Sequence, residues 1–261
     1  MCIMTPNVTE REREILTFLA DDPSAGVGAL AERLAVSQVS VRSYLNALEE
    51  KGYLIRVHGG AVTTYHPHVL DRQTAHAKRK RAIAKAAAEY VEDGDTIMIE
   101  AGTTTALVAR YLLGKRDVMV VTNNTLALSY LRGNPGVRVT VIGGEYRSAT
   151  ESLVGPLAVE DIKRFHVRIA FVGTDGFTVG AGFTTHIVEG AEIVRCMAAQ
   201  AQETIAVADS SKYGRLGFVH VLPLQDVDTL VTDSDIAASA TEELTESGLT
   251  VKTIPIPGKE K

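Results

Sequence analysis

Residues 97–110 read IMIEAGTTTALVAR. An apolar run ends in an acid and a glycine, and three threonines then open a stretch that suits a helix. A helix that starts in this way points backbone N–H groups and the positive end of its dipole at the turn, which suits a bound phosphate. Glycine and threonine are also common turn and cap residues, so one such turn is more often structural. The surrounding sequence decides between these interpretations.

The same order of strand and helix recurs from Gly94 to the end of the chain. The sequence predicts strands near residues 96–100, 118–122, 137–142, 169–172, 204–208, 229–231 and 251–254, and helices near 104–113, 125–132, 188–202 and 237–247. Such alternation is typical of a mainly parallel sheet that is covered by helices on both faces. We therefore predict a doubly wound α/β domain over residues 91–261.

Residues 9–64 have a different pattern, which begins with two short helices. Thr9 and Glu12 have the spacing of a capping box, in which each side chain accepts a hydrogen bond from the other residue's backbone N–H. Apolar residues then recur at helical spacing over 15–19 and again over 27–34.

A third helix is predicted over residues 38–51, with Ser37 as its N-cap and Gly52 in the left-handed position beyond its end. Only three residues separate it from the second helix, so the two helices must cross steeply, as in a helix-turn-helix. Two short strands, residues 53–57 and 61–64, follow as a hairpin and add a wing.

A winged helix-turn-helix over residues 1–64 binds DNA by placing its third helix in the major groove. Arg pairs with guanine there, Gln and Asn pair with adenine, and phosphate contacts orient the protein without reading sequence. The predicted base contacts are Gln38, Ser40, Arg42, Ser43 and Asn46, and the predicted phosphate contacts are Arg56 and His58. The alternative is a packing module whose polar face meets only solvent.

A basic stretch separates the two regions. It carries six cations and no acid between Arg72 and Lys85, although the whole chain has a net charge of -5. We predict a linker over residues 65–90 and interpret its charge first as a solvated helix face. As the covalent route between the domains, it is also a candidate lever between them and a candidate contact for the DNA backbone.

Composition excludes several classes of protein. No apolar run approaches the roughly 20 residues of a membrane-spanning helix. The two cysteines, Cys2 and Cys196, lie far apart and outside any CxxC pair, which fits a reducing compartment and offers no zinc site. The seven histidines lack ligand spacing. We expect a cytoplasmic protein without a membrane partner, a metal or a cofactor.

The predicted strand ends supply a candidate ligand site. In open parallel sheets, ligands bind outside the carboxyl ends of the strands. Small and polar residues follow five of these ends, in segments that we call the carboxyl-edge loops: residues 100–105, 122–124, 143–145, 173–176 and 209–212. We predict a phosphate seat at Gly102, Thr103, Thr104 and Thr105 with Lys212 as its cation, and contacts to sugar hydroxyls from Glu100, Asn123, Asp175 and Thr184. A phosphorylated sugar satisfies all of these groups.

Two other functions fit the same residues. An isomerase would use a carboxylate to move a proton beside a carbonyl, with a lysine or amide to steady the enolate. The sequence has no nucleophile elbow, and His66, His68, His166 and His186 fall outside the carboxyl-edge loops or at their margin. In the third possibility, the C-terminal domain only oligomerises or binds a protein.

The motifs resemble a known family. VSQVSVRSYLNALEEKGYLIRVHGGAV (36–62) resembles the winged helix-turn-helix of the DeoR family of bacterial transcriptional regulators. Further matches follow in the family's order, namely DGDTIMIEAGTTT (93–105), VVTNN (120–124), VIGGEYR (141–147), LVGPLA (153–158), FVGTDGF (171–177), GFTT (182–185) and ADSSKYGR (208–215).

The resemblance implies a cytoplasmic repressor of sugar-catabolic genes that binds a double-stranded DNA operator. It also implies a C-terminal domain similar to ribose-5-phosphate isomerase, which binds a phosphorylated sugar as effector and supports a homo-oligomer, a dimer or tetramer. Paired recognition helices would then hold a two-part operator, and the effector would change their spacing or orientation.

The chain departs from the family pattern at three places. Ser43-Tyr44 stands where Arg-Asp is frequent, so the operator sequence does not carry over. Glu100 stands where Asp is common, which moves the carboxylate by one methylene. Gly190 and Val194 replace the usual Glu and Lys on the helix after GFTT, which changes the effector or its affinity.

The resemblance also bears on catalysis. The isomerase that the domain resembles has a second acid soon after the first, whereas residues 173–177 offer only Asp175. A base without its positioned partner is a poor catalyst, although it remains a good hydroxyl contact. We therefore predict a sensor with no catalytic residues.

Overall fold

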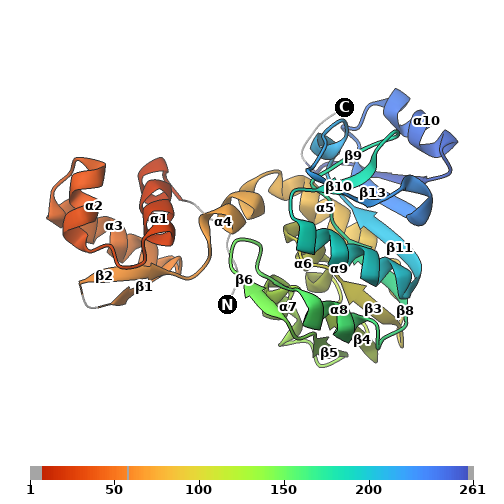
Figure 1. The fold of residues 1–261 in the computed structure, drawn as a ribbon, viewed down its shortest axis with the longest axis horizontal. Coiled ribbons are helices and arrows are strands. Elements are labelled where there is room, and N and C mark those ends of the chain that lie inside the picture. Colours follow the sequence, from red (N-terminus) through yellow and green to blue (C-terminus); the bar gives the residue numbers. More distant parts are fainter. Residues whose placement is uncertain (1–7, 58, 258–261) are drawn as a thin grey trace. The chain divides into compact units, whose positions relative to one another are not determined.

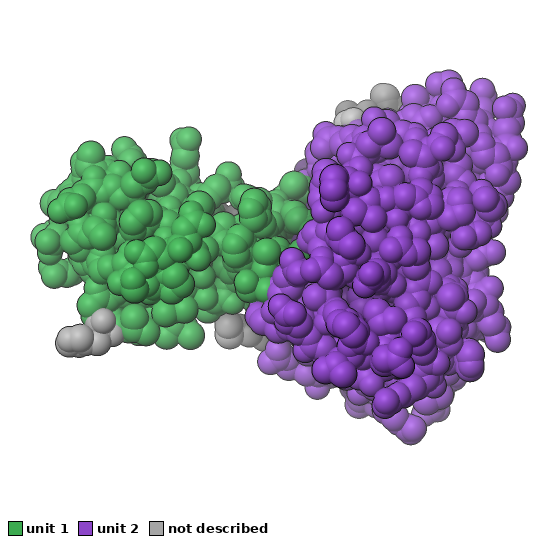
Figure 2. Space-filling model, in the orientation of Figure 1, with its two compact units in different colours: residues 1–75, 148–150 green, residues 76–147, 151–261 purple. Residues whose placement is uncertain are grey.

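The computed structural model describes residues 8–57 and 59–257. Two compact units divide the chain, and Figure 2 shows them in different colours. The first comprises the chain up to Ala75 together with residues 148–150, and the second comprises residues 76–147 and 151 onward. Each unit has its own hydrophobic core.

The first unit is a winged helix-turn-helix (Figure 1). Its elements are α1 (Glu10–Asp21), α2 (Val27–Leu34), α3 (Gln38–Glu50), the antiparallel hairpin of β1 (Leu54–Val57) and β2 (Gly60–Thr63), and α4 (Pro67–Thr74). The three helices bury Ile15, Leu30, Val41, Leu45 and Leu48, each with no exposed surface. The predicted order of helices and wing is confirmed.

Local signals in the sequence set the ends of these helices. The Thr9 hydroxyl accepts from the Glu12 N–H at 3.3 Å, and the Glu12 carboxylate accepts from the Thr9 N–H at 2.8 Å, so the predicted capping box forms. Ser37 accepts from the Ser40 N–H at 3.1 Å and caps α3 as predicted. The chain leaves α3 through Gly52 at φ +76°, the left-handed backbone that glycine adopts without a steric penalty.

The second unit is built on a seven-stranded parallel sheet in the order β14-β13-β11-β8-β3-β4-β5. Its strands are β3 (Thr96–Ile99), β4 (Val118–Thr122), β5 (Val137–Val141), β8 (Val167–Val172), β11 (Ala201–Val207), β13 (Thr229–Asp233) and β14 (Thr250–Ile254). All seven lie where the sequence predicted strands, so the parallel α/β architecture is confirmed.

Helices cover both faces of this sheet. They are α5 (Ala77–Ala88), α6 (Thr103–Arg110), α7 (Thr125–Leu131), α8 (Pro156–Ile162), α9 (Val188–Ala199) and α10 (Ala238–Glu246). Met98 and Ala170 share a core with residues of α8, α9 and α10, while α5 packs against α6, β11 and β13. Because side chains alternate along a strand, Ile97 and Ile99 face the side opposite to Met98.

Short antiparallel elements complete the second unit, and the sequence did not indicate them. They are the hairpin of β6 (Glu145–Arg147) and β7 (Ser152–Val154), a small sheet β12-β10-β9 made of β9 (Gly176–Thr178), β10 (Gly182–Thr185) and β12 (Val219–Leu222), and the 3-10 turns η1 (Ser210–Lys212) and η2 (Leu224–Asp226).

The stretch interpreted from the sequence as a linker, residues 65–90, is mostly helical. It contains α4 in the first unit and α5 in the second. Helix α5 buries Lys80 together with Ile83, Ala84 and Ala87. Its basic residues therefore include one that faces the interior of the second unit, not only a solvated face.

None of the helices among the described residues is both long enough and apolar enough to cross a bilayer.

Candidate recognition helix and ligand site

The outward face of α3 carries most of the predicted base contacts. Gln38, Arg42, Ser43 and Asn46 are exposed. The opposite face is the buried core face described above, so the polar side chains are left outside by packing. This arrangement is the one that major-groove recognition requires.

Ser40 differs from its neighbours on α3. It is half-buried, its N–H donates to the Ser37 hydroxyl at 3.1 Å, and the two hydroxyls lie 3.0 Å apart. Ser40 is therefore part of the cap of α3.

Two of the predicted DNA contacts bond each other. Arg56 on β1 donates from Nη1 to Oδ1 of Asn46 at 2.7 Å, and its backbone N–H donates to the Glu49 carboxylate at 3.0 Å. These bonds fasten the wing to α3. A paired contact from Asn46 to adenine would use the second lone pair of the same Oδ1, so Arg56 restricts how this amide can turn. His58, the other predicted wing contact, lies outside the described residues.

In the second unit, the turn before α6 is held by its own polar groups. The Thr105 hydroxyl donates to the Gly102 carbonyl at 2.9 Å, and Asn124 donates from Nδ2 to the carbonyls of Glu100 and Gly102, each at 3.0 Å. A Cβ on Gly102 would lie 3.0 Å from the Thr105 hydroxyl, so glycine suits the turn. Thr105 and Asn124 are fully buried and act as its scaffold.

Glu100 joins two neighbouring strands at the same edge of the sheet. Its side chain is 7% exposed, and Oε2 accepts from the Gly173 N–H at 3.0 Å. Because Glu100 follows β3 and Gly173 follows β8, this bond closes the gap between the two strand ends. The carboxylate is thus committed at least partly to the fold.

A buried lysine reaches the first residue of α6. Lys80 of α5 donates from Nζ to the Thr103 hydroxyl at 3.1 Å, and the two residues are 6% and 7% exposed. Thr104, the next residue of α6, is 9% exposed. In the sequence, Lys80 stands out only as part of a basic stretch.

A helical period could have singled it out, because Ile83, Ala84 and Ala87 lie three, four and seven residues beyond Lys80.

Lys212 lies in η1, at the carboxyl end of β11, and is half-buried. The neighbouring residue of α5 holds this turn: Arg79 donates from Nη1 to the Ser210 hydroxyl at 3.0 Å and from Nη2 to Asp235. Adjacent residues of α5 therefore contact the start of α6 and η1. Since β11, β8 and β3 are neighbouring parallel strands, the loops with Thr103 and Lys212 share one edge of the sheet.

Two more predicted residues lie at the small antiparallel sheet, Asp175 directly before β9 and Thr184 within β10. Asp175 accepts at Oδ2 from the Thr185 hydroxyl at 2.8 Å and from the His186 N–H at 3.1 Å. Thr184 donates its hydroxyl hydrogen to the Gly176 carbonyl at 2.8 Å and accepts from the Gly217 N–H at 2.7 Å. A hydroxyl has one hydrogen to donate, so Thr184 is committed to the fold.

Asn123 has spare hydrogen-bonding capacity. It is 1% exposed, and its Nδ2 donates to the Leu153 carbonyl at 3.1 Å. Its Oδ1 is buried and has no hydrogen-bond partner in the part of the chain that the structure describes. Buried acceptors are rarely left in this state, so this oxygen is a candidate contact for a ligand hydroxyl.

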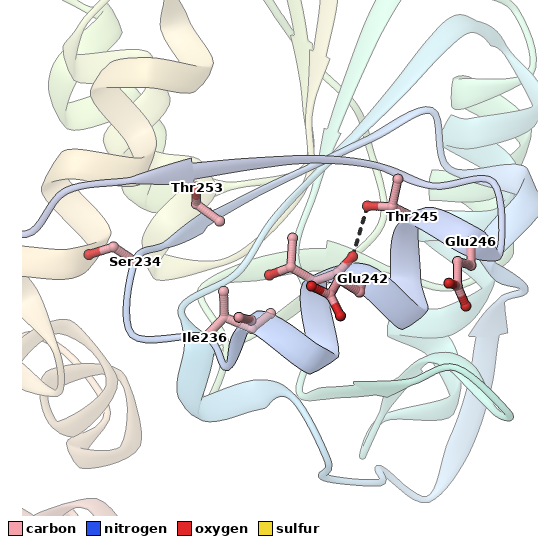
Figure 3. A pocket seen from close by; sticks show the side chains of 8 residues that line it. Ser234, Ile236, Glu242, Thr245, Glu246 and Thr253 are labelled. Atoms are coloured by element: carbon pink, nitrogen blue, oxygen red, sulfur yellow. Dashed lines mark hydrogen bonds between the residues drawn. The ribbon is translucent and has the colours of Figure 1, made fainter.

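A separate groove of about 560 Å³ lies between α10 and β14 (Figure 3). Its described lining residues are Ser234, Ile236, Ala238, Thr241, Glu242, Thr245, Glu246 and Thr253, two of them carboxylates and none of them a cation. The two carboxylates would repel a phosphate, so this groove is a poorer candidate for an anion site than the turn before α6, here called the Thr103 turn. Nowhere in residues 8–57 and 59–257 do three or more His, Cys, Asp or Glu side chains gather to hold a metal ion.

Comparison with protein families places both units. The DeoR-like helix-turn-helix domain matches residues 11–65, and the DeoR C terminal sensor domain matches residues 75–234. The chain belongs to the DeoR family. The predicted resemblance is thereby confirmed over most of the chain.

Curated relatives agree with this assignment. The HTH-type transcriptional regulator GlpR of Haloferax volcanii is 34% identical, with 93% of this chain and 96% of that protein covered. The HTH-type transcriptional repressor CsqR of Escherichia coli is 30% identical over 92% of this chain and 94% of its own length. Ribose 5-phosphate isomerase from Plasmodium falciparum is similar in structure at a TM-score of 0.37 and 19% identity, over 52% of each chain.

The family assignment distinguishes between the two main functions that the sequence left open, a transcriptional regulator and an isomerase. Relatives that match nearly the whole chain are named as transcriptional regulators and repressors. This DeoR-family protein is accordingly a DNA-binding regulator and not an enzyme, and the isomerase alternative is set aside.

Proposed function

We propose that this protein is a cytoplasmic repressor of carbohydrate-catabolic genes whose operator binding is modulated by a phosphorylated sugar at the Thr103 turn. Helix α3 lies in the major groove and contacts bases through the exposed residues named above. The protein works as a homo-oligomer, a dimer or tetramer, that holds a two-part operator. Relatives that are named as transcriptional repressors support the repressor part of the proposal.

The hydrogen bond from Lys80 to Thr103 is the main observation that supports a phosphate-containing ligand. A buried ammonium group lies at the first residue of α6, where the helix dipole is also positive. A phosphate placed there would accept from the N–H groups at the start of α6 and from Lys80. Lys212 adds a second cation from the same edge.

The buried Oδ1 of Asn123 supports the sugar part of the ligand. It follows β4, next to the strand that leads into the Thr103 turn. A hydroxyl hydrogen from a sugar would satisfy this acceptor and remove the cost of leaving it unpaired. One anionic group at the start of α6 and one hydroxyl donor at Asn123 together favour a hydroxylated phosphate ester.

Helix α5 offers a route for the ligand to act on DNA binding. It begins at the point where the second unit begins, and Arg79 and Lys80 in its first turns hold η1 and α6. A phosphate that draws Lys80 away from Thr103 changes what fixes this helix. Regulation then requires that the ligand binds one of two conformations of the protein more tightly, because equal affinity for both would not shift the equilibrium between them.

A thermal-shift screen of the full-length chain tests the proposal. The panel contains ribose 5-phosphate, glucose 6-phosphate, fructose 1-phosphate and glycerol 3-phosphate, each beside its unphosphorylated parent and beside inorganic phosphate. We expect at least one phosphate ester to raise the melting temperature more than its parent and more than phosphate. No stabilisation by any ester would contradict the ligand class.

Each ester that stabilises the protein is then tested on DNA binding. A DNA duplex selected from a random-sequence library serves as the operator, and fluorescence anisotropy measures its affinity with and without the ester. We expect the affinity to change, and to fall steeply with salt because phosphate contacts release counterions. Light scattering should show a dimer or tetramer, and a monomer bound to one half-site would contradict the assembly.

A further inference from the structure

One large apolar side chain stands among the polar residues of the recognition helix. Val39, the second residue of α3, is 73% exposed. Arg42, Ser43 and Asn46 follow it at three, four and seven residues, so the four residues form one stripe along the helix. Val39 is thus part of the surface that the helix presents to DNA.

Packing does not explain this valine. The core face of α3 is complete without it, because Val41, Leu45 and Leu48 have no exposed surface. Single exposed apolar residues are common on proteins and need no function by themselves. Val39 differs in its position, since the N-terminal residues of a recognition helix are the ones that contact base edges.

The chemistry of the major groove supplies one apolar partner for such a side chain, the C5-methyl group of thymine. The bond from Arg56 to Oδ1 of Asn46 at 2.7 Å restricts how that amide can turn toward an adenine. Contact with the thymine methyl group gives the stripe a second way to recognise an A·T pair.

We propose that Val39 is a specificity-determining residue that packs against the methyl group of a thymine in each half-site of the operator. This inference rests on the proposed placement of α3 in the major groove. Arg42 and Ser43, one turn further along, contact the adjoining base pairs. The operator therefore contains a thymine that the protein recognises by shape and not by a hydrogen bond.

Replacing thymine by uracil isolates this contact, because uracil keeps every hydrogen-bonding group of thymine and lacks only the methyl. Burying one methyl group is worth about fourfold in affinity. We expect the full-length protein to lose about fourfold at one thymine position per half-site. The Val39→Ala variant should bind the thymine duplex about as weakly as the original protein binds the uracil duplex, and should no longer distinguish the two.

The experiment uses duplexes selected from a random-sequence library, with each thymine changed to uracil in turn, and anisotropy titrations of the full-length variants. Val39→Thr keeps a methyl group and should keep part of the discrimination. Ile55→Ala is the matched control, since Ile55 is 60% exposed on the wing, outside the stripe, and should leave the uracil scan unchanged.

Two results would overturn the inference: no uracil position that weakens binding, or a Val39→Ala variant with the same sensitivity to uracil as the original protein. The Arg42→Ala variant separates these results from a failure of the proposed function. If Arg42→Ala also leaves sequence preference unchanged, α3 does not contact bases at all. If Arg42→Ala alters that preference while the uracil scan stays flat, only the role of Val39 is wrong.

Discussion

The outward stripe of α3 and the turn before α6 are both rich in polar residues. The two sets differ in whether their side chains are exposed or bonded to the protein's own backbone. On α3, Gln38, Arg42 and Ser43 are exposed and away from the core. At the turn, Thr105 and Asn124 are fully buried and bond the backbone around them. One surface is available for a partner, while much of the other is occupied by the protein itself.

This difference follows from burial. A polar group that leaves water must find a partner, and in a tight turn the nearest partner is the turn's own backbone. A list of polar residues in a loop therefore overstates the contacts left for a ligand. We expect substitutions at the turn to act first on stability and substitutions on α3 to act first on DNA binding.

The largest effect should come from Asn124→Ala. The side chain donates to two carbonyls at 3.0 Å and accepts from the Ala127 N–H at 3.2 Å, which also caps α7. Loss of these bonds in a fully buried place should lower the free energy of unfolding of the second unit by about 3 kcal/mol or more. Pulse proteolysis in urea, with fragments of the two units distinguished by mass spectrometry, measures it.

Asn124→Ser is the matched control, because its hydroxyl keeps an oxygen that can cap α7 while the amide nitrogen that donates to the Glu100 and Gly102 carbonyls is lost. It should recover part of the stability. The first unit should unfold at the same urea concentration in all three proteins. A variant Asn124→Ala as stable as the original protein would show that the turn does not depend on its buried polar groups.

Much of the fold could be predicted because its signals are local and periodic. The seven parallel strands are apolar runs bounded by glycine and polar residues, and the caps at Thr9 and Ser37 stand directly before their helices. The small antiparallel sheet could not be predicted in this way. Its β9, β10 and β12 have three or four residues each, and the pairing of β10 with β12 joins residues about 35 positions apart.

The candidate site could be predicted only in outline. The loops follow from strand ends, so Thr103 and Lys212 were expected at one edge of the sheet, as the neighbouring strands place them. Side-chain orientation was not available from the pattern. It decides that Thr184 bonds two backbone groups and that Lys80, from a stretch interpreted as solvated, is buried against Thr103.

Lys80→Met tests whether the buried ammonium group at the turn before α6 contributes to ligand binding. It removes the ammonium group beside α6 and keeps an unbranched side chain in the same buried place. A charge-assisted hydrogen bond to phosphate is worth about 30-fold in affinity. We expect a phosphate ester found by thermal shift to bind about 30-fold more weakly, as measured by calorimetry.

Lys78→Met is the matched control for this substitution. Lys78 is on the same helix and is exposed, so its loss should leave calorimetric affinity for the ester as it was. Equal weakening by the two variants would mean that only the overall charge of α5 matters. Lys212→Ala should also weaken binding, by less than Lys80→Met because Lys212 is only half-buried.

Arg42→Ala tests the exposed surface. Since Arg42 is outside the core of the first unit, the variant should unfold at the same urea concentration as the original protein. A paired contact from arginine to guanine is worth about 10-fold or more in discrimination between bases. We expect a loss of about that size on a selected duplex in anisotropy titrations, with the thermal shift by phosphate esters intact.

Arg33→Ala, on α2, is the control for charge alone, and Arg33 is likewise exposed. It should change affinity for all duplexes by a similar, smaller factor. If Arg42→Ala behaved in the same way, then Arg42 would contact phosphates only and the stripe would lose its main base contact.

The smallest expected effect concerns a buried polar group within the DNA-binding unit itself. Glu12 is 4% exposed, and its carboxylate accepts from Lys51 at 2.7 Å and 2.9 Å and from the Thr9 N–H. Burial on its own raises the pKa of Glu12, but the hydrogen bonds from Lys51 and Thr9 together outweigh it and hold the pKa below its ordinary value of 4.5.

A carboxyl whose pKa is lower in the folded protein than in the unfolded chain stabilises the fold above its ordinary pKa, and this contribution is lost as the pH falls through the folded value. Glu12→Gln should therefore lower the free energy of unfolding of the first unit by about 1 kcal/mol at pH 7. The difference should shrink below pH 4.5, where the original carboxyl becomes protonated. Pulse proteolysis at pH 7 measures the first value, and urea unfolding by circular dichroism measures the second. A gap that stayed constant with pH would show that the effect of Glu12 does not come from its ionised carboxylate.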